Sequence, residues 1–101
     1  MMTVLEAFLA GVFLFNAIPH MAQGICGKEH MTPLGRVSSP VINVVWAWVN
    51  LVVGTLIARA SDPLSWTCST SAAFGLGGFL TSTCLAVFWS NPEARLPWHK
   101  K

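Results

Sequence analysis

Three long apolar runs separated by polar connections dominate the pattern of the chain. Residues 3–20 are apolar on nearly every helical face, residues 41–60 carry no charge before Arg59, and residues 72–89 form a third run. A helix rises about 1.5 Å per residue and a membrane span needs about 20 apolar residues, so each run is long enough, or nearly so, to cross a bilayer. The pattern predicts an all-α membrane protein, a single domain (1–101) with three transmembrane helices.

The first run lies at the short limit for a span and ends near Pro19. Proline removes a backbone donor and clashes with the carbonyl four residues earlier, which leaves open a kinked continuation of the helix as far as Gln23. An amino-terminal apolar run can also be a secretory signal. A signal begins with positive charge, whereas the only early charge here is Glu6, so we expect a retained helix.

Segment 21–40, between the first two runs, is polar and interrupted by glycine and proline. We expect these residues to break any helix: Gly24, Gly27, Pro33, Gly35 and Pro40. Ser38 and Ser39 before Pro40 predict the cap and first turn of the second helix, because proline suits the first helical position. The sequence leaves open whether this predicted hairpin re-enters the membrane.

Two of the predicted helices carry a stripe of small and polar residues along one face. The second helix has Asn43, Ala47, Asn50, Gly54 and Ala58, and the third has Ser71, Gly75, Gly78, Ser82 and Ala86. Spacings of three and four place each set on one side of its helix. An unpaired amide in hydrocarbon is costly, so the stripe of the second helix should face protein. The stripe of the third predicts a helix-packing face.

Composition supports the membrane class and excludes others. Charged residues make up 10% of the 101-residue chain, against roughly 25% in a typical soluble protein, and the mean hydropathy is +0.58. The partner we expect is therefore the lipid bilayer. A net charge of +2 gives no basis for nucleic-acid binding. The three cysteines have no paired spacing, so neither a disulfide framework nor a zinc site is predicted.

The distribution of basic residues predicts an orientation. Segment 21–40 carries Lys28 and Arg36, and the tail carries Arg95, Lys100 and Lys101, whereas the other side of the membrane would have only Arg59. The positive-inside rule then puts the amino terminus outside, and segment 21–40 and the carboxyl terminus in the cytoplasm.

This topology brings the polar side chains Asn16 and His20 of the first helix close to Asn43 and Asn50 of the second. They could form a polar pocket open to the cytoplasm, with His20 as a proton acceptor or ligand. They could instead hydrogen-bond from helix to helix, each bond contributing about 0.6 to 2 kcal/mol. We favour the second interpretation, and the first stays open.

Metal binding and catalysis have less support. The side chains of His20, Met21, Cys26, His30 and Met31 would suit copper or haem iron. Their spacing matches no closed site, so no metal and no cofactor is predicted. The four carboxylates form no general acid and base pair, and the chain has no phosphate loop or nucleophile elbow, so we do not expect an enzyme.

The block LFNAIPHMAQGICGKEHMTPLG (14–35), followed by SSPVINVVWAWVNLVVG (38–54), resembles an uncharacterised family of small bacterial integral membrane proteins with three helices. The resemblance covers about the first half of the chain. It implies a multi-pass protein of the bacterial inner membrane and implies no activity.

The sequence thus predicts a binding or assembly function. The chain would be a scaffold or accessory subunit that packs through its two stripes, as a homo-oligomer or within a larger membrane complex. A small transporter or channel lined by Asn16, His20, Asn43 and Asn50 is the main alternative. A third possibility is a binder of a hydrophobic small molecule or quinone in the same pocket, with Trp46 as a wall.

Overall fold

The computed structural model describes residues 2–94 and 96–98, which are mostly helical (73%). The helices are α1 (Met2–Ile25), α2 (Pro40–Ala60) and α3 (Cys68–Trp89), with a short 3-10 helix at Pro63–Ser65. Each of the three long helices is long and apolar enough to span a membrane, as the hydropathy pattern predicted. Of the basic residues behind the predicted orientation, Arg95, Lys100 and Lys101 lie outside the described residues.

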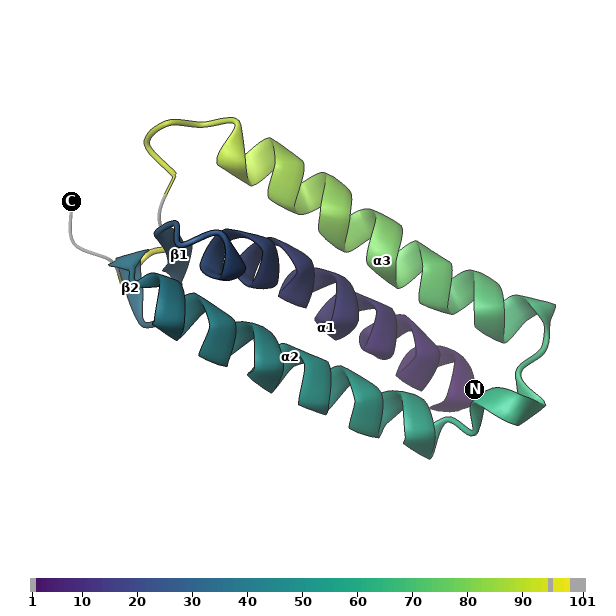
Figure 1. Ribbon diagram of the computed structural model, residues 1–101. Helices are drawn as coiled ribbons and strands as arrows, with labels where there is room; N and C mark the ends of the chain where they lie inside the picture. Colours follow the sequence, from purple (N-terminus) through teal and green to yellow (C-terminus); the bar gives the residue numbers. More distant parts are fainter. Residues whose placement is uncertain (1, 95, 99–101) are drawn as a thin grey trace.

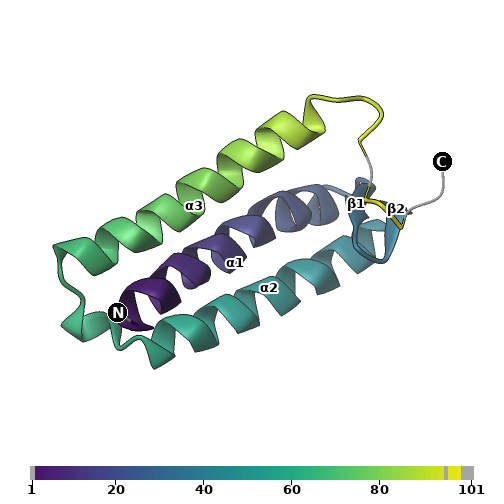
Figure 2. The same ribbon diagram turned by 180° about the vertical axis from the view of Figure 1, so that it is seen from behind.

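Helix α1 lies between α2 and α3 and packs along both of them (Figure 1). Among the described residues, α2 and α3 have few contacts with each other. The view from behind shows the same order, with a small hairpin next to the carboxyl end of α1 and the amino end of α2 (Figure 2). Helix α1 therefore packs against α2 with one side and against α3 with another.

The first helix is longer than we expected, because it continues through Pro19 to Ile25. Gly24, predicted to break the helix, instead allows α1 and α2 to approach. A Cβ at this position would come within 2.7 Å of the Val44 side chain and 2.8 Å of the Pro40 carbonyl oxygen. Packing against α2 thus stabilises the turn that follows the proline.

Helix α1 is followed, two residues beyond its end, by a glycine with a left-handed backbone. Gly27 has φ +71°, and its N–H donates to the Gly24 carbonyl at 3.0 Å, while the N–H of Lys28 donates to the Gln23 carbonyl at 2.8 Å. These two bonds form a Schellman motif, in which glycine tolerates the positive φ and the last carbonyls find donors.

Segment 21–40, predicted as a hairpin without assigned strands, contains the antiparallel strands β1 (His30–Thr32) and β2 (Gly35–Ser38). His30 pairs with Ser38 and Thr32 with Gly35, with an irregularity between the two pairs. The hydroxyl oxygens of Thr32 and Ser38 lie 2.7 Å apart. An isolated two-stranded hairpin is marginal in water, so these strands need support from the helices.

Side-chain caps set the beginnings of α2 and α3. The Ser39 hydroxyl accepts from the Ile42 N–H at 3.1 Å and Pro40 is the first helical residue, which confirms the predicted cap. The Thr67 hydroxyl accepts from the Thr70 N–H at 3.4 Å. Helix α3 therefore begins four residues before the predicted start at residue 72.

The stripe on α2 packs as predicted over four of its five residues, and the fifth, Ala58, is half-buried. Asn43, Ala47, Asn50 and Gly54 are the buried residues of this helix. A Cβ at Gly54 would come within 2.7 Å of the Leu14 side chain on α1, so this glycine gives the central helix room to approach. The polar and small face of α2 is thus buried within the chain.

The face of α3 that packs within the chain differs from the predicted one. Its buried residues are Thr70, Gly77 and Gly78. A Cβ at Gly77 would collide with the carbonyl oxygen of Phe8, and one at Gly11 with that of Phe74, so the backbones of α1 and α3 touch here. Of the predicted face, Gly78 is buried, and four residues are exposed in the chain: Ser71, Gly75, Ser82 and Ala86.

Candidate functional site

The four polar residues singled out in the sequence form two hydrogen-bonded pairs between α1 and α2. The Asn16 amide nitrogen donates to Oδ1 of Asn50 at 3.1 Å. Nδ1 of His20 lies 2.9 Å from Oδ1 of Asn43. Asn16 and His20 are four residues apart, so they share one face of α1. The structure therefore brings all four residues together.

Asn43 is fully buried and connects three elements. Its amide nitrogen lies 2.8 Å from the carbonyl oxygen of His30, 3.2 Å from that of Ser38 and 3.1 Å from that of Ser39. These carbonyls can only accept, so the NH2 group of Asn43 must face them and Oδ1 must face His20. This one side chain holds the hairpin against α2 and presents an acceptor to α1.

The orientation of Asn43 determines the tautomer of His20. Oδ1 of an amide can only accept, so Nδ1 of His20 carries the proton and donates to it. In the neutral ring, Nε2 is then an acceptor. No hydrogen bond within the described part of the chain involves Nε2, although the His20 side chain is 6% exposed.

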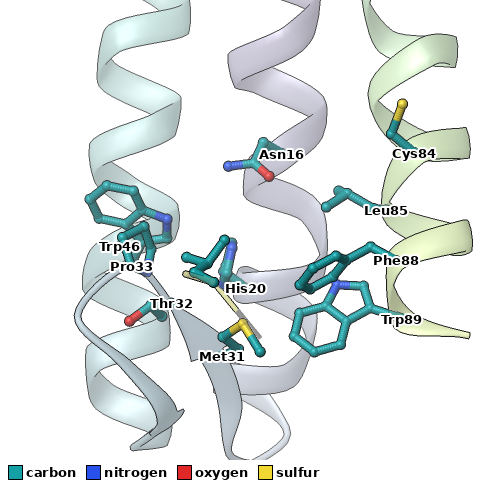
Figure 3. Close-up of a pocket in the computed structure, with 11 residues that line it drawn as sticks. Asn16, His20, Met31, Thr32, Pro33, Trp46, Cys84, Leu85, Phe88 and Trp89 are labelled. Carbon is teal, nitrogen blue, oxygen red and sulfur yellow. The ribbon is translucent and has the colours of Figure 1, made fainter. Parts of the chain in front are cut away.

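Asn50 orients Asn16 in the same way. The Asn50 amide nitrogen donates to the Trp46 carbonyl at 3.0 Å, so its Oδ1 accepts from Asn16. The amide nitrogen of Asn16 therefore has a hydrogen-bond partner, whereas its Oδ1 has none among the described residues. Figure 3 shows the nitrogen of Asn16 turned towards α2 and its oxygen turned away from that helix.

A cavity of about 330 Å³ lies beside these pairs, between α1, α3 and the hairpin; we call it the hairpin cavity (Figure 3). It is lined by Asn16, His20, Met31, Thr32, Pro33, Trp46, Cys84, Leu85, Phe88, Trp89 and Leu96. Asn16 and His20 thus line the cavity directly, whereas Asn43 and Asn50 lie behind them and orient them. Apolar and aromatic walls with a few polar groups are typical of small-molecule sites.

His30 packs behind the cavity wall, between two lining side chains. Its ring centroid lies 5.2 Å from that of His20 and 4.3 Å from that of Trp89. Burial lowers the pKa of His30, and the neighbouring His20 lowers it further. Nε2 of His30 and Nε1 of Trp89 are buried without a hydrogen-bond partner among the described residues. Such unmade bonds each cost about 1–3 kcal/mol.

The nitrogen and sulfur residues considered for a metal are only partly brought together. The rings of His20 and His30 are in contact, and Met31 lines the same cavity as His20. Cys26 is exposed at the end of α1. Among the described residues, no group of three or more His, Cys, Asp or Glu side chains could hold a metal ion.

The cavity walls contributed by α3 and the tail were missed in the sequence. Phe88 and Trp89 line the cavity, whereas Ser90 and Asn91, which follow them in the chain, are exposed and outside its lining. The tail returns over the hairpin, where Nε1 of Trp98 donates to the Pro33 carbonyl at 2.8 Å. The one available signal was the aromatic pair at the end of the third apolar run, which fits a membrane-boundary belt equally well.

Comparisons with protein-family models, curated proteins and solved structures found no match to this chain. The resemblance of its first half to small bacterial membrane proteins therefore stays a prediction. Any function must be argued from the cavity and the helices alone.

Proposed function

We propose that this chain is a small multi-pass membrane protein that binds a hydrophobic small molecule in the hairpin cavity. The observation that carries the proposal is the composition of the cavity wall. Trp46, Phe88 and Trp89 supply aromatic surface, and Asn16 and His20 each present one polar atom that no other described residue uses. A volume of about 330 Å³ lies within the range of roughly 300–1,000 Å³ of ligand pockets.

The burial and the hydrogen bonds of the Asn43 and Asn50 side chains favour ligand binding over transport. A transport pathway would need the α2 stripe to face water. Asn43 is fully buried and Asn50 is 3% exposed, and both amides hydrogen-bond to neighbouring groups. Such satisfied groups support a closed wall behind a pocket.

We further propose that the three helices cross the bacterial inner membrane, with the amino terminus outside and the hairpin at the cytoplasmic boundary. Lys28 and Arg36 lie at the hairpin end, and Arg59 lies at the far end of α2. Basic residues are enriched on the cytoplasmic side, which supports this orientation. The cavity would then open near the inner lipid headgroups.

Native mass spectrometry of the protein in mild detergent tests the binding function. We expect a retained small molecule, distinct from lipid, on the unmodified chain. Leu85→Trp, which fills the cavity from α3, should abolish this retention. Leu80→Trp is the matched control, because Leu80 is 42% exposed and lies outside the cavity lining. Equal retention by the two variants would contradict the proposal.

The exposed face of α3 favours a second role, as a scaffold or accessory subunit. Ser71, Gly75, Ser82 and Ala86 form a row of small residues that the chain itself leaves uncovered, and such rows let membrane helices pack closely. A Cβ at Gly75 would meet no atom within 4 Å. Gly75→Leu should therefore reduce the oligomeric mass in detergent without unfolding the chain, and an unchanged mass would exclude this face as a contact.

A further inference from the structure

We propose that the molecule bound in the hairpin cavity is a hydrophobic compound whose polar end is a hydroxyl group, of which phenols are the simplest members. The proposal rests on the binding function proposed above and adds the chemistry of the ligand. Its basis is the donor or acceptor character of each free polar atom in the cavity wall, which the surrounding hydrogen bonds determine.

The first free atom is Nε2 of His20, and two consecutive hydrogen bonds make it an acceptor. The backbone carbonyl of His30 fixes the NH2 group of Asn43, and Oδ1 of Asn43 then accepts a hydrogen bond from the Nδ1–H of His20. The neutral imidazole has one donor and one acceptor nitrogen. Because the donor, Nδ1–H, is already bonded to Asn43, Nε2 can bind only a group that donates a hydrogen bond to it.

The second free atom is Oδ1 of Asn16, which is also an acceptor. The carbonyl of Trp46 accepts from the amide nitrogen of Asn50 and so fixes the orientation of that amide. Oδ1 of Asn50 then accepts a hydrogen bond from the NH2 group of Asn16. Asn16 and His20 lie one helical turn apart on the same face of α1, about 5–6 Å along the axis. The α1 side of the cavity therefore presents two acceptors in a row.

The ring of Trp89 lines the cavity from the α3 side and offers aromatic surface there. Its Nε1 is buried and has no hydrogen-bond partner among the described residues. The requirement on the ligand therefore comes from α1: its polar end must donate a hydrogen bond to one of the two acceptors, Nε2 of His20 or Oδ1 of Asn16.

A hydroxyl group meets this requirement, since its oxygen carries a proton that it can donate. An ether or ketone oxygen can only accept, so it leaves Nε2 of His20 without a donor. A charged end would enter a cavity whose described lining includes no Lys, Arg, Asp or Glu, and an unpaired buried charge is strongly disfavoured. The polar end is thus neutral and carries a proton.

A pair of probes that differ only at this oxygen, a hydroxyl group in one and a methyl ether in the other, tests the proposal. We would titrate the full chain in lipid nanodiscs with para-butylphenol and with its methyl ether, following binding by calorimetry. The phenol should bind about tenfold more tightly, because the ether leaves a buried acceptor unpaired. His20→Phe, which removes the acceptor, should abolish this preference, so that the ratio of the two affinities falls to within about twofold of one.

Nitrogen-15 NMR of labelled histidine in the unmodified chain provides a readout that does not depend on how a variant folds. His20 should carry its proton on Nδ1 in the free protein, and the Nε2 resonance should shift on addition of the phenol but not of the ether. A proton on Nε2 in the free protein would overturn the proposal.

The outcomes separate this proposal from the binding function. Equal affinity for the two probes, with both blocked by Leu85→Trp, would overturn the hydroxyl requirement and retain the cavity as a binding site. No binding of either probe, together with no retained molecule in native mass spectrometry, would overturn both. Tighter binding of the phenol that His20→Phe leaves unchanged would show that His20 is not the acceptor.

Discussion

Oδ1 of Asn43 on α2 lies 2.9 Å from Nδ1 of His20 on α1. The nitrogen of the same amide lies within 3.2 Å of three backbone carbonyl oxygens at and beside the hairpin. One fully buried side chain therefore joins two helices to the hairpin and fixes the tautomer of a cavity residue. Burial of so polar a group is tolerated because each of its hydrogen-bonding atoms has a partner.

Asn43→Leu should destabilise the protein substantially. The substitution leaves the carbonyls of His30 and Ser38, and the ring N–H of His20, without this partner in a buried region. Each buried group left unpaired costs about 1–3 kcal/mol, so we expect a loss of about 3 kcal/mol in the free energy of unfolding. Denaturant unfolding in detergent micelles, followed by circular dichroism, measures it.

The matched control for this change is Asn91→Leu. Asn91 is exposed, and its side chain accepts from the nearby Glu93 N–H at the surface. Exposed substitutions usually change stability by less than about 0.5 kcal/mol. If the two variants unfold at the same denaturant concentration, Asn43 does not join the elements in the way described.

Gly77→Ala should separate α1 from α3. The added methyl group would collide with the backbone carbonyl oxygen of Phe8, which cannot turn aside as a side chain can. Overpacking of this kind costs about 1–3 kcal/mol. Gly75→Ala on the same helix meets open space and should raise helix stability by up to about 1 kcal/mol. Opposite shifts in the midpoint of thermal unfolding are expected, and shifts of the same sign would contradict the close contact.

Acid should weaken the hairpin end of the molecule through His30. Burial and the neighbouring His20 lower the pKa of His30 below its ordinary value of 6.5. The unfolded chain then binds the proton more readily than the folded one, so this contribution is present above about pH 6.5 and is lost as the pH falls towards the lowered pKa.

Unfolding measured between pH 8 and pH 5 tests this dependence. His30→Phe keeps an aromatic ring against Trp89 and cannot take up a proton, so its stability should fall less over this range than that of the unmodified chain. An equal fall in both proteins would assign the pH dependence to another group.

The proposed orientation predicts which cysteine is accessible from each side. Cys26 is exposed at the hairpin end and Cys68 at the opposite end, at the start of α3. A maleimide that cannot cross membranes, added to intact cells, should label the chain through Cys68. Labelling should be lost in Cys68→Ser and kept in Cys26→Ser. The reverse pattern would invert the topology.

Local patterns in the sequence determined the helices and one buried face. The three apolar runs, the Ser39 cap with Pro40, and the Asn43 to Gly54 stripe are all present in the structure. Each depends on residues within a few turns of one another, because helical periodicity and capping are properties of a short segment. Such features can be predicted without knowledge of what a segment packs against.

Contacts between distant segments decided the rest. The turn after Pro19 persists because Gly24 fits against α2, and the short hairpin is held by an amide from the next helix. The rotation of α3 depends on Gly77 meeting the backbone of Phe8, a contact that spacing along α3 alone cannot distinguish from the neighbouring row. These long-range contacts form the cavity, and they fix which polar atoms of His20 and Asn16 donate and which accept. Only the tertiary structure determined these features.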